Sequence, residues 1–109
     1  MKTVTKRDIV RHVTDKMEKY TQEQVQAIVQ ETLDHITASL AAGDQVVLRN
    51  FGVFGIRRTE AKVGRNPKVK GSEVRIPPRA VVKFRPGKEM RDRVAQVLPH
   101  LDESLRRND

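Results

Sequence analysis

The chain changes its structural period within residues 45–56, which read Gln45-Val46-Val47-Leu48-Arg49-Asn50-Phe51-Gly52-Val53-Phe54-Gly55-Ile56. The apolar run at its start, residues 45–49, predicts a short strand. The next three residues, 50–52, predict a turn, because Asn and Gly adopt left-handed backbone conformations more easily than other residues. A second strand is predicted over residues 53–60, with Phe54 and Ile56 on one face. Two neighbouring strands therefore stand at the centre of the chain.

Two amphipathic helices are predicted before these strands. The pairs Thr5–Asp8 and Thr21–Gln24 each have the spacing of a capping box, which marks the start of a helix. Gly43 is a natural residue just beyond the second helix, because glycine adopts positive φ without strain. The second helix carries an apolar stripe made of Val25, Ile28, Val29, Leu33, Ile36 and Leu40. A stripe of this length must face a core, and a chain this short offers little to cover it.

Residues 61–75 are basic and contain only three large apolar residues, all of them valine. Such a segment cannot bury a core of its own and is predicted to project into solvent. Two extended strands of about six residues, joined near Pro67, would form a β-ribbon arm over about residues 59–77. A two-stranded ribbon without a core is marginally stable in water, so the arm is expected to order on a ligand.

A third strand is predicted over residues 80–85, with Val82 and Phe84 on one face. A last helix follows and is predicted to end at Pro99, and its inward residues are expected to be Met90, Val94, Val97 and Leu98. Residues 1–98 form one domain in this reading, and residues 99–109 form a polar, flexible tail. Helices and strands that do not alternate predict an α+β fold with an antiparallel sheet.

Size and composition predict a second copy of the chain. The sequence has 109 residues, of which 37% are hydrophobic, and it contains no Trp. That inventory builds only a thin core, and small domains bury too little surface to be stable alone. We therefore expect an obligate dimer.

Several classes of site are not expected. The absence of cysteine excludes disulfides and thiolate metal sites. The three histidines, His12, His35 and His100, lack the spacing of metal ligands, so no metal or other cofactor is expected. The first ten residues are charged and lack the apolar segment of a signal peptide, and no apolar run is long enough to cross a membrane. A cytoplasmic protein without a membrane partner is the expectation.

The net charge of +8 is confined to one stretch. Residues 57–85 carry ten Lys or Arg against two Glu, whereas residues 1–56 hold seven basic and seven acidic residues and residues 86–109 hold five of each. A localised basic strip indicates a polyanion, most simply nucleic acid held through its phosphates. A solvated basic loop without a partner is the alternative. The candidate contacts are Arg57, Arg58, Lys62, Arg65, Lys68, Lys70, Arg75, Arg79, Lys83 and Arg85.

Pro67 stands at the expected tip of the arm. Its rigid, apolar ring could insert between base steps of the minor groove and kink a duplex, as apolar wedges do in minor-groove architectural proteins. An ordinary turn proline after Asn66 is the alternative interpretation.

Three motifs together resemble the bacterial HU/integration host factor family. They are Asn50-Phe51-Gly52-Val53-Phe54, Gly64-Arg65-Asn66-Pro67 and Phe84-Arg85-Pro86-Gly87-Lys88, and they come in the family's order at near-family spacing. The resemblance covers about residues 5–98. The return half of the arm departs from it, because Lys68-Val69-Lys70-Gly71-Ser72-Glu73 is one residue longer than the family pattern. An extra residue in a ribbon turns side chains to the other face unless a bulge absorbs it.

The resemblance implies an intertwined dimer with an N-terminal helical hairpin, a three-stranded β-saddle that extends into β-ribbon arms, and a short C-terminal helix. Two arms would wrap the minor groove of double-stranded DNA in the bacterial nucleoid and bend it. Carried over by position, Pro67 intercalates, Arg65 and Asn66 line the groove beside it, and Arg85 and Lys88 contact phosphates at the start of the last helix. Small-molecule substrates are not implied.

Three functional hypotheses remain open. The leading one is a homodimeric, DNA-bending architectural protein with weak sequence preference. A sequence-specific regulator, for example one subunit of a heterodimer like integration host factor, is the second. Arg49 resembles a residue that helps one such subunit read sequence, but Val47 replaces the acidic residue that would orient it, so Arg49 is interpreted as a phosphate contact. An enzyme is the third, and it is not favoured because Glu60 and Glu73 stand isolated among cations.

Overall fold

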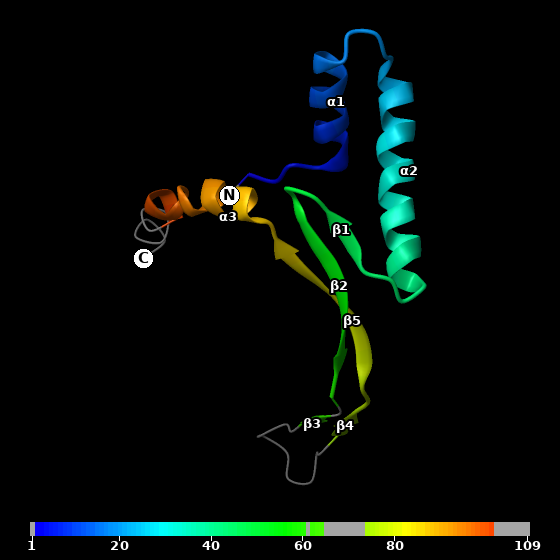
Figure 1. The fold of residues 1–109 in the computed structure, drawn as a ribbon, viewed down its shortest axis with the longest axis vertical. Helices are drawn as coiled ribbons and strands as arrows, with labels where there is room; N and C mark the ends of the chain where they lie inside the picture. The colour runs from blue at the N-terminus through cyan, green and yellow to red at the C-terminus, as the bar shows by residue number, and fades with distance from the viewer. Residues whose placement is uncertain (1, 61, 65–73, 102–109) are drawn as a thin grey trace.

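The structure is a computed structural model that describes residues 2–60, 62–64 and 74–101. Two antiparallel helices form a hairpin, α1 (Lys6–Lys16) and α2 (Gln22–Ala41). As Figure 1 shows, the hairpin stands on one side of a sheet whose long strands run away from it into an arm. None of the described helices is long and apolar enough to cross a bilayer.

Both helices begin at the predicted capping boxes. The Thr5 backbone N–H and hydroxyl both donate to the Asp8 carboxylate, at 3.0 and 3.1 Å, and these bonds lower the pKa of Asp8. Thr21 and Gln24 form the same reciprocal pair at the start of α2. Just beyond the end of this helix, Gly43 has a φ of +91°, and the Asp44 N–H reaches back 3.0 Å to the carbonyl of Ser39. Local chemistry therefore sets where the hairpin helices begin and end.

Three strands form an antiparallel sheet in the order β1-β2-β5. They are β1 (Val46–Leu48), β2 (Gly52–Thr59) and β5 (Arg79–Pro86). The turn between the first two strands has Asn50 at φ +68°, as its sequence predicts. Strands β2 and β5 pair over eight residues without a bulge, from Gly52 opposite Pro86 to Thr59 opposite Arg79.

The predicted arm is a continuation of this ladder. Strands β3 (Lys62–Gly64) and β4 (Val74–Ile76) pair antiparallel. Their pairs, such as Lys62 with Ile76, have the same register as the pairs of β2 with β5. The interruption between the two sheets falls at Pro77 and Pro78, which have no N–H to donate to a ladder. The ribbon therefore leaves the saddle in a single register.

The last helix is shorter than predicted. Helix α3 (Lys88–Ala95) follows its N-cap Gly87 and ends four residues before Pro99. Pro99 does not end a helix. It lies early in a further helical turn at residues 98–101, closed by a bond from the Leu101 N–H to the Val97 carbonyl, and at that position a missing N–H costs nothing.

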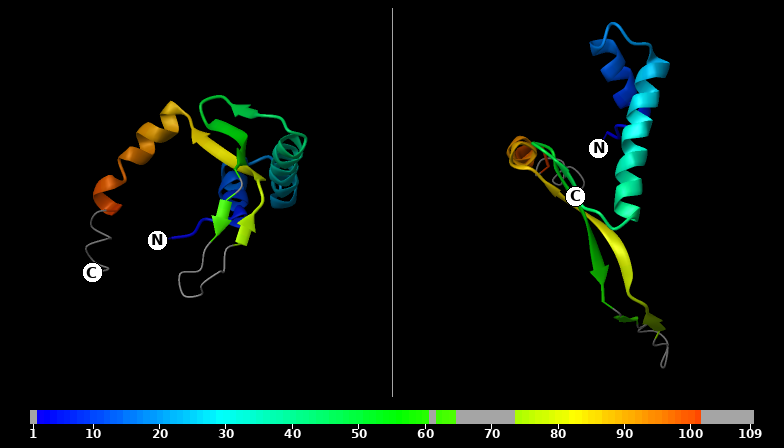
Figure 2. Two further views of the ribbon diagram at one scale, coloured as in Figure 1. Left: turned by 90° about the horizontal axis from the view of Figure 1, so that it is seen from below. Right: turned by 45° about the vertical axis from the view of Figure 1, so that its right-hand side comes forward.

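One chain buries little of its apolar surface. Of the described apolar side chains, only Val10 and Val25 are fully buried, and both lie in the helical hairpin. As the sequence predicts for a chain with little to cover it, the α2 stripe is only partly covered, and its Ile28 is 59% exposed. The radius of gyration is 20.0 Å, against about 13 Å for a compact chain of this length. Figure 2 shows the open arrangement from two further sides, with α3 reaching away from the sheet.

Three aromatic rings stabilise the sheet end nearest α3. The ring of Phe84 lies 5.7 Å from that of Phe51 and 4.7 Å from that of Phe54, with tilted planes that favour aromatic contact. Gly52 is buried beneath this cluster. A Cβ atom there would lie 2.5 Å from the Phe84 ring and 2.7 Å from the carbonyl oxygen of Arg85. Glycine is thus required at position 52 by close approach.

We predict that Gly52→Ala lowers the free energy of unfolding by about 1–3 kcal/mol, because the ring and the strand must shift to admit the methyl group. The matched control is Gly55→Ala in the same strand, where a Cβ atom meets nothing within 4 Å. That control should leave stability unchanged or raise it by roughly 0.4–1 kcal/mol. Denaturant unfolding at one fixed protein concentration measures both. Equal losses in the two variants would contradict the packing argument.

Candidate nucleic-acid interface

The ladder of β2 with β5 sorts side chains onto two faces, because successive residues of a strand point to opposite sides. One face is apolar, with the cross-strand pairs Phe54–Phe84 and Ile56–Val82. The sequence prediction that these residues share a face is confirmed by the register. Val46 and Leu48 of β1 join this face through their pairing with β2.

The opposite face, which we call the basic face, gathers four cations. It carries Arg57 on β2 and Arg79, Lys83 and Arg85 on β5. All four are exposed. The only salt bridge among the described residues lies elsewhere, on α3, so none of these cations is neutralised by a neighbouring carboxylate in the described part of the chain. Unpaired cations on one open surface attract an extended anion rather than stabilise the fold.

The basic face is hollowed at its centre. A depression of about 420 Å³ is lined by Gly43, Asp44, Gln45, Val53, Gly55, Ile56, Arg57, Lys83 and Arg85. Three of the four cations therefore share one concavity. Residue 55 lies directly opposite Lys83, and residue 53 lies directly opposite Arg85.

Other candidates fall in different places. Arg58 lies on the apolar face, one register position away from the other cations, so the sheet does not bring it together with them. Arg49 lies in the turn after β1, and that turn contacts the start of α3 through a 2.8 Å bond from the Gly87 N–H to the Phe51 carbonyl. Lys88 is the first residue of α3 and pairs with Asp92 at 3.0 Å. Its side chain is 83% exposed, so this pair is weak and a phosphate could replace the carboxylate.

The arm positions are described only in part. Lys62 lies in β3 and Arg75 lies in β4, one register step from facing each other. The predictions for Arg65, Asn66, Pro67, Lys68 and Lys70 concern positions outside the described residues. Because β3 with β4 keeps the register of the saddle, no bulge in the described ladder absorbs the extra residue of the return strand.

Arg79 is held where the saddle passes into the arm. The Thr59 hydroxyl donates to the Arg79 carbonyl and accepts from the Arg79 N–H, both at 3.2 Å. These bonds close the last pair of the β2–β5 ladder before Pro77 and Pro78 interrupt it. The base of the arm is therefore fixed to the sheet by a side chain as well as by the backbone.

Sequence reasoning missed the floor of the depression. It assigned Phe54 and Ile56 to the apolar face but gave no role to Val53 and Gly55, which alternate with them. The signal was available in the alternation Val53, Gly55, Arg57, which places a valine and a glycine on the same face as a cation.

Within residues 2–60, 62–64 and 74–101, no three His, Cys, Asp or Glu side chains gather as metal ligands would. The interface as described can neutralise and seat an anionic polymer.

Comparisons with known proteins agree with this geometry. Residues 4–95 match the family model of the bacterial DNA-binding proteins. The chain is 43% identical over 94 residues to integration host factor subunit alpha of a Ruegeria species, covering 86% of this chain and 92% of that protein. It is 36% identical over 91 residues to subunit beta of the same factor from Photobacterium profundum, covering 84% and 94%.

Solved structures show the same fold. The structure of HU from Anabaena in a cocrystal with DNA superposes with a TM-score of 0.76 at 35% identity, over 84% of this chain and 98% of that one. A mutant of HU from Thermotoga maritima superposes with a TM-score of 0.60 at 24% identity, which supports the fold alone. The match covers 84% of this chain and 99% of the mutant's chain.

Proposed function

The chain belongs to the bacterial DNA-binding protein family of HU and integration host factor, and from this we propose that it works as a dimer that bends double-stranded DNA through the minor groove with weak sequence preference. The observation that carries the proposal is the basic face, where four exposed cations of β2 and β5 lie on a sheet that extends into the arm in one register. Its place in the cell would be the bacterial nucleoid.

The phosphate contacts supply affinity in this proposal. Lys and Arg on an open face release counterions from the DNA backbone, which gives binding that depends on salt and hardly on sequence. Arg57, Arg79, Lys83 and Arg85 provide this on the sheet. Lys62 and Arg75, with Arg65, Lys68 and Lys70 beyond them, would extend it along the arm. Arg49 and Lys88 would add contacts beside α3.

The bend would come from Pro67. A rigid apolar ring at the end of an arm can separate two stacked base pairs, and the unstacking energy is offset by the extra surface that a bent duplex brings into contact. Arg65 and Asn66 would line the groove beside the wedge. This role is carried to Pro67 by its position in Gly64-Arg65-Asn66-Pro67 and by the ribbon that leads toward it.

In this proposal the partner that the open fold favours is a second copy of the chain. The chain exposes 10204 Å², whereas a compact monomer of 12.5 kDa exposes about 6,200 Å². Obligate dimers bury roughly 2,000–5,000 Å² in total, which fits within this excess. Dimerisation would also place two basic faces and two arms on one duplex.

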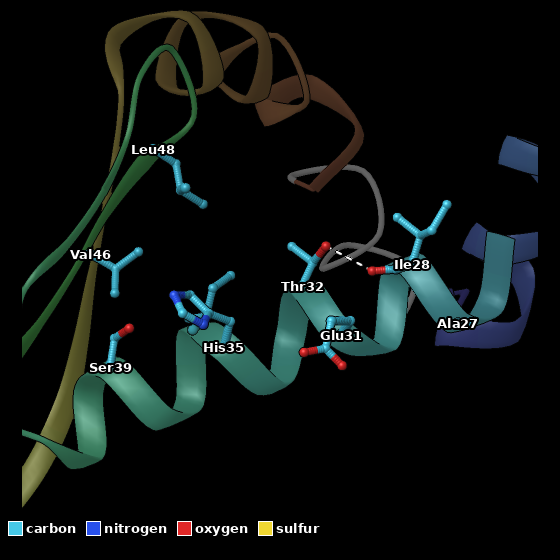
Figure 3. A pocket seen from close by; sticks show the side chains of 9 residues that line it. Ala27, Ile28, Glu31, Thr32, His35, Ser39, Val46 and Leu48 are labelled. Carbon is cyan, nitrogen blue, oxygen red and sulfur yellow. Dashed lines mark hydrogen bonds between the residues drawn. The ribbon is translucent and has the colours of Figure 1, made fainter. Parts of the chain in front are cut away.

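The seat for that copy is an apolar groove of about 720 Å³ between α2 and β1. Figure 3 shows Ile28, Thr32 and His35 of α2 across from Val46 and Leu48 of β1. The groove is open on the side that one chain leaves bare, and its apolar lining is what an obligate interface buries. A like chain, with the same amphipathic α2, would fill it by symmetry.

The alternative is a sequence-specific regulator, one subunit of a heterodimer. Both subunits of integration host factor are among the relatives, at 36% and 43% identity, so similarity alone does not separate the two functions. The basic face favours the architectural function, because Val53, which lies on that face opposite Arg85, carries no hydrogen-bonding group that could read a base edge.

We predict that Pro67→Ala reduces the bend while leaving affinity nearly unchanged, because the substitution removes the wedge and no charge. Fluorescence transfer between the ends of a labelled duplex measures the bend. Pro99→Ala is the control, since it removes a proline far from the arm. An unchanged end-to-end distance of the duplex in the Pro67 variant would contradict intercalation by Pro67.

Arg65→Ala should act differently from the wedge variant. Loss of a phosphate contact weakens binding and flattens the plot of log affinity against log salt by about 1 per contact, and thus by about 2 in a dimer. Titrations over a salt series measure the slope. A slope equal to that of the unsubstituted protein would remove Arg65 from the phosphate contacts.

We predict that Ile28→Glu dissociates the dimer, because a carboxylate buried without a partner costs roughly 3–5 kcal/mol. Ala38→Glu is the matched control, since Ala38 is exposed on α2 and lines neither this groove nor the second hollow beside α2, which is lined by residues such as Thr37, Leu40 and Val82. Sedimentation equilibrium, with and without duplex, should give twice the chain mass of 12.5 kDa for the unsubstituted protein and for the control. A dimeric Ile28 variant would contradict the assigned seat.

Competition between one defined site and random duplex separates the two functions. The architectural proposal expects an affinity ratio near one, whereas specific DNA-binding proteins prefer their sites by roughly 10³ or more. Mixtures with each integration host factor subunit should be measured in parallel. A large ratio, alone or only in a mixture, would establish the regulator.

A further inference from the structure

Gly55 occupies the centre of the depression on the basic face. It lies directly opposite Lys83, it precedes Arg57 by two residues on the same strand, and Arg85 is its diagonal neighbour on β5. Opposite residues of an antiparallel pair lie about 5 Å apart and diagonal ones about 7–8 Å apart. Three cationic side chains therefore surround the one position of this face that has no side chain.

The fold does not require glycine at position 55. Among the described glycines only Gly43 has a positive φ, so Gly55 has a backbone conformation open to any residue. The eight pairs of β2 with β5 are unbroken around it, which excludes a bulge. A Cβ atom there would meet nothing within 4 Å, unlike one at Gly52. Glycine inside a strand costs roughly 0.5–1 kcal/mol, and here no packing contact offsets that cost.

Glycine in a strand without a bulge or a tight internal contact marks a place where a ligand or another backbone comes close. The surrounding charges select the ligand, because three cations outnumber the single carboxylate that lines the depression, that of Asp44. Arg57 and Arg85 offer forked N–H donors and Lys83 offers a point charge, a combination that suits the oxygens of a phosphodiester. Val53, which also lines the depression, offers no polar side-chain group and suits a sugar face.

We infer that Gly55 is the seat of one DNA strand's sugar-phosphate backbone, held between Arg57, Lys83 and Arg85. The missing side chain sets how deeply the duplex lies on the sheet, and thereby whether the three cations reach one phosphate together. Residue 55 is a positioning residue, since it acts by leaving space. This inference rests on the proposed function.

The test is a size series at position 55, with affinity for a short random-sequence duplex and thermal stability measured on the same preparations. Gly55→Ala should weaken binding moderately, and Gly55→Val should weaken it by about tenfold for each chain, the lower end of the value of a hydrogen bond to a charged group, and thus by about a hundredfold in a dimer. Neither variant should lower Tm, because the added atoms meet open space. Should Gly55→Val unfold, Gly55→Ala carries the test.

Val47→Ile is the matched control. It adds one carbon on the same face of the sheet, at a side chain that is 65% exposed and does not line the depression. Its affinity should stay within about twofold of the unsubstituted protein, since no cation contact changes. The inference is overturned if Gly55→Val binds the duplex as tightly as the unsubstituted protein. It is also overturned if Val47→Ile loses as much duplex affinity as Gly55→Ala.

A further measurement distinguishes binding of a duplex from binding of a free phosphate ion. Replacing chloride by inorganic phosphate at equal ionic strength should leave the affinity of the unsubstituted protein unchanged. If phosphate lowers the duplex affinity of the unsubstituted protein but not that of Gly55→Ala, the depression binds a small phosphate ion, and the inference is overturned. If the unsubstituted protein shows no salt-dependent duplex binding, the proposed function itself fails. Normal binding by the unsubstituted protein with no effect of residue 55 removes only this inference.

Discussion

The unbroken register of β2 with β5 is the constraint on which the rest of the structure depends. It places Phe54 opposite Phe84 on one face and Gly55 opposite Lys83 on the other. A slip of one residue in β2 relative to β5 would mix aromatic rings with cations and destroy both faces. Gly52 fixes the register at one end, because only glycine fits under the Phe84 ring. The same register continues into β3 and β4, so the arm is an extension of this single ladder.

Separation into two faces links assembly to binding. The apolar face and α2 form a groove that a single chain leaves uncovered. The basic face stays exposed to solvent because it is charged. In the proposed dimer, a second chain that covers the first face would not compete with DNA for the second. Folding, dimerisation and duplex binding would then depend on one sheet without interfering, and stability would depend on protein concentration.

Local chemistry made much of the fold predictable. The caps at Thr5 and Thr21, the end at Gly43 and the turn at Asn50 follow from the conformational preferences of single residues or close pairs. The end of the last helix was not predictable, because Pro99 is compatible with the first turn of a new helical segment. The candidate site was predictable as a set of charges but not as a surface. Only the register separates Arg58 from Arg57 and brings Gly55 between the cations.

The division of labour between the sheet and the arm follows from energetics. The basic face holds four cations in each chain and thus eight in a dimer, and neutralising that many phosphates would give a salt slope of about −7. A wedge costs a few kcal/mol of lost stacking at each kink, which such a face can offset at low salt. A rise in salt weakens the phosphate contacts but leaves the stacking cost of the kinks unchanged. A protein built in this way would therefore lose its strongly bent complexes before it loses DNA altogether.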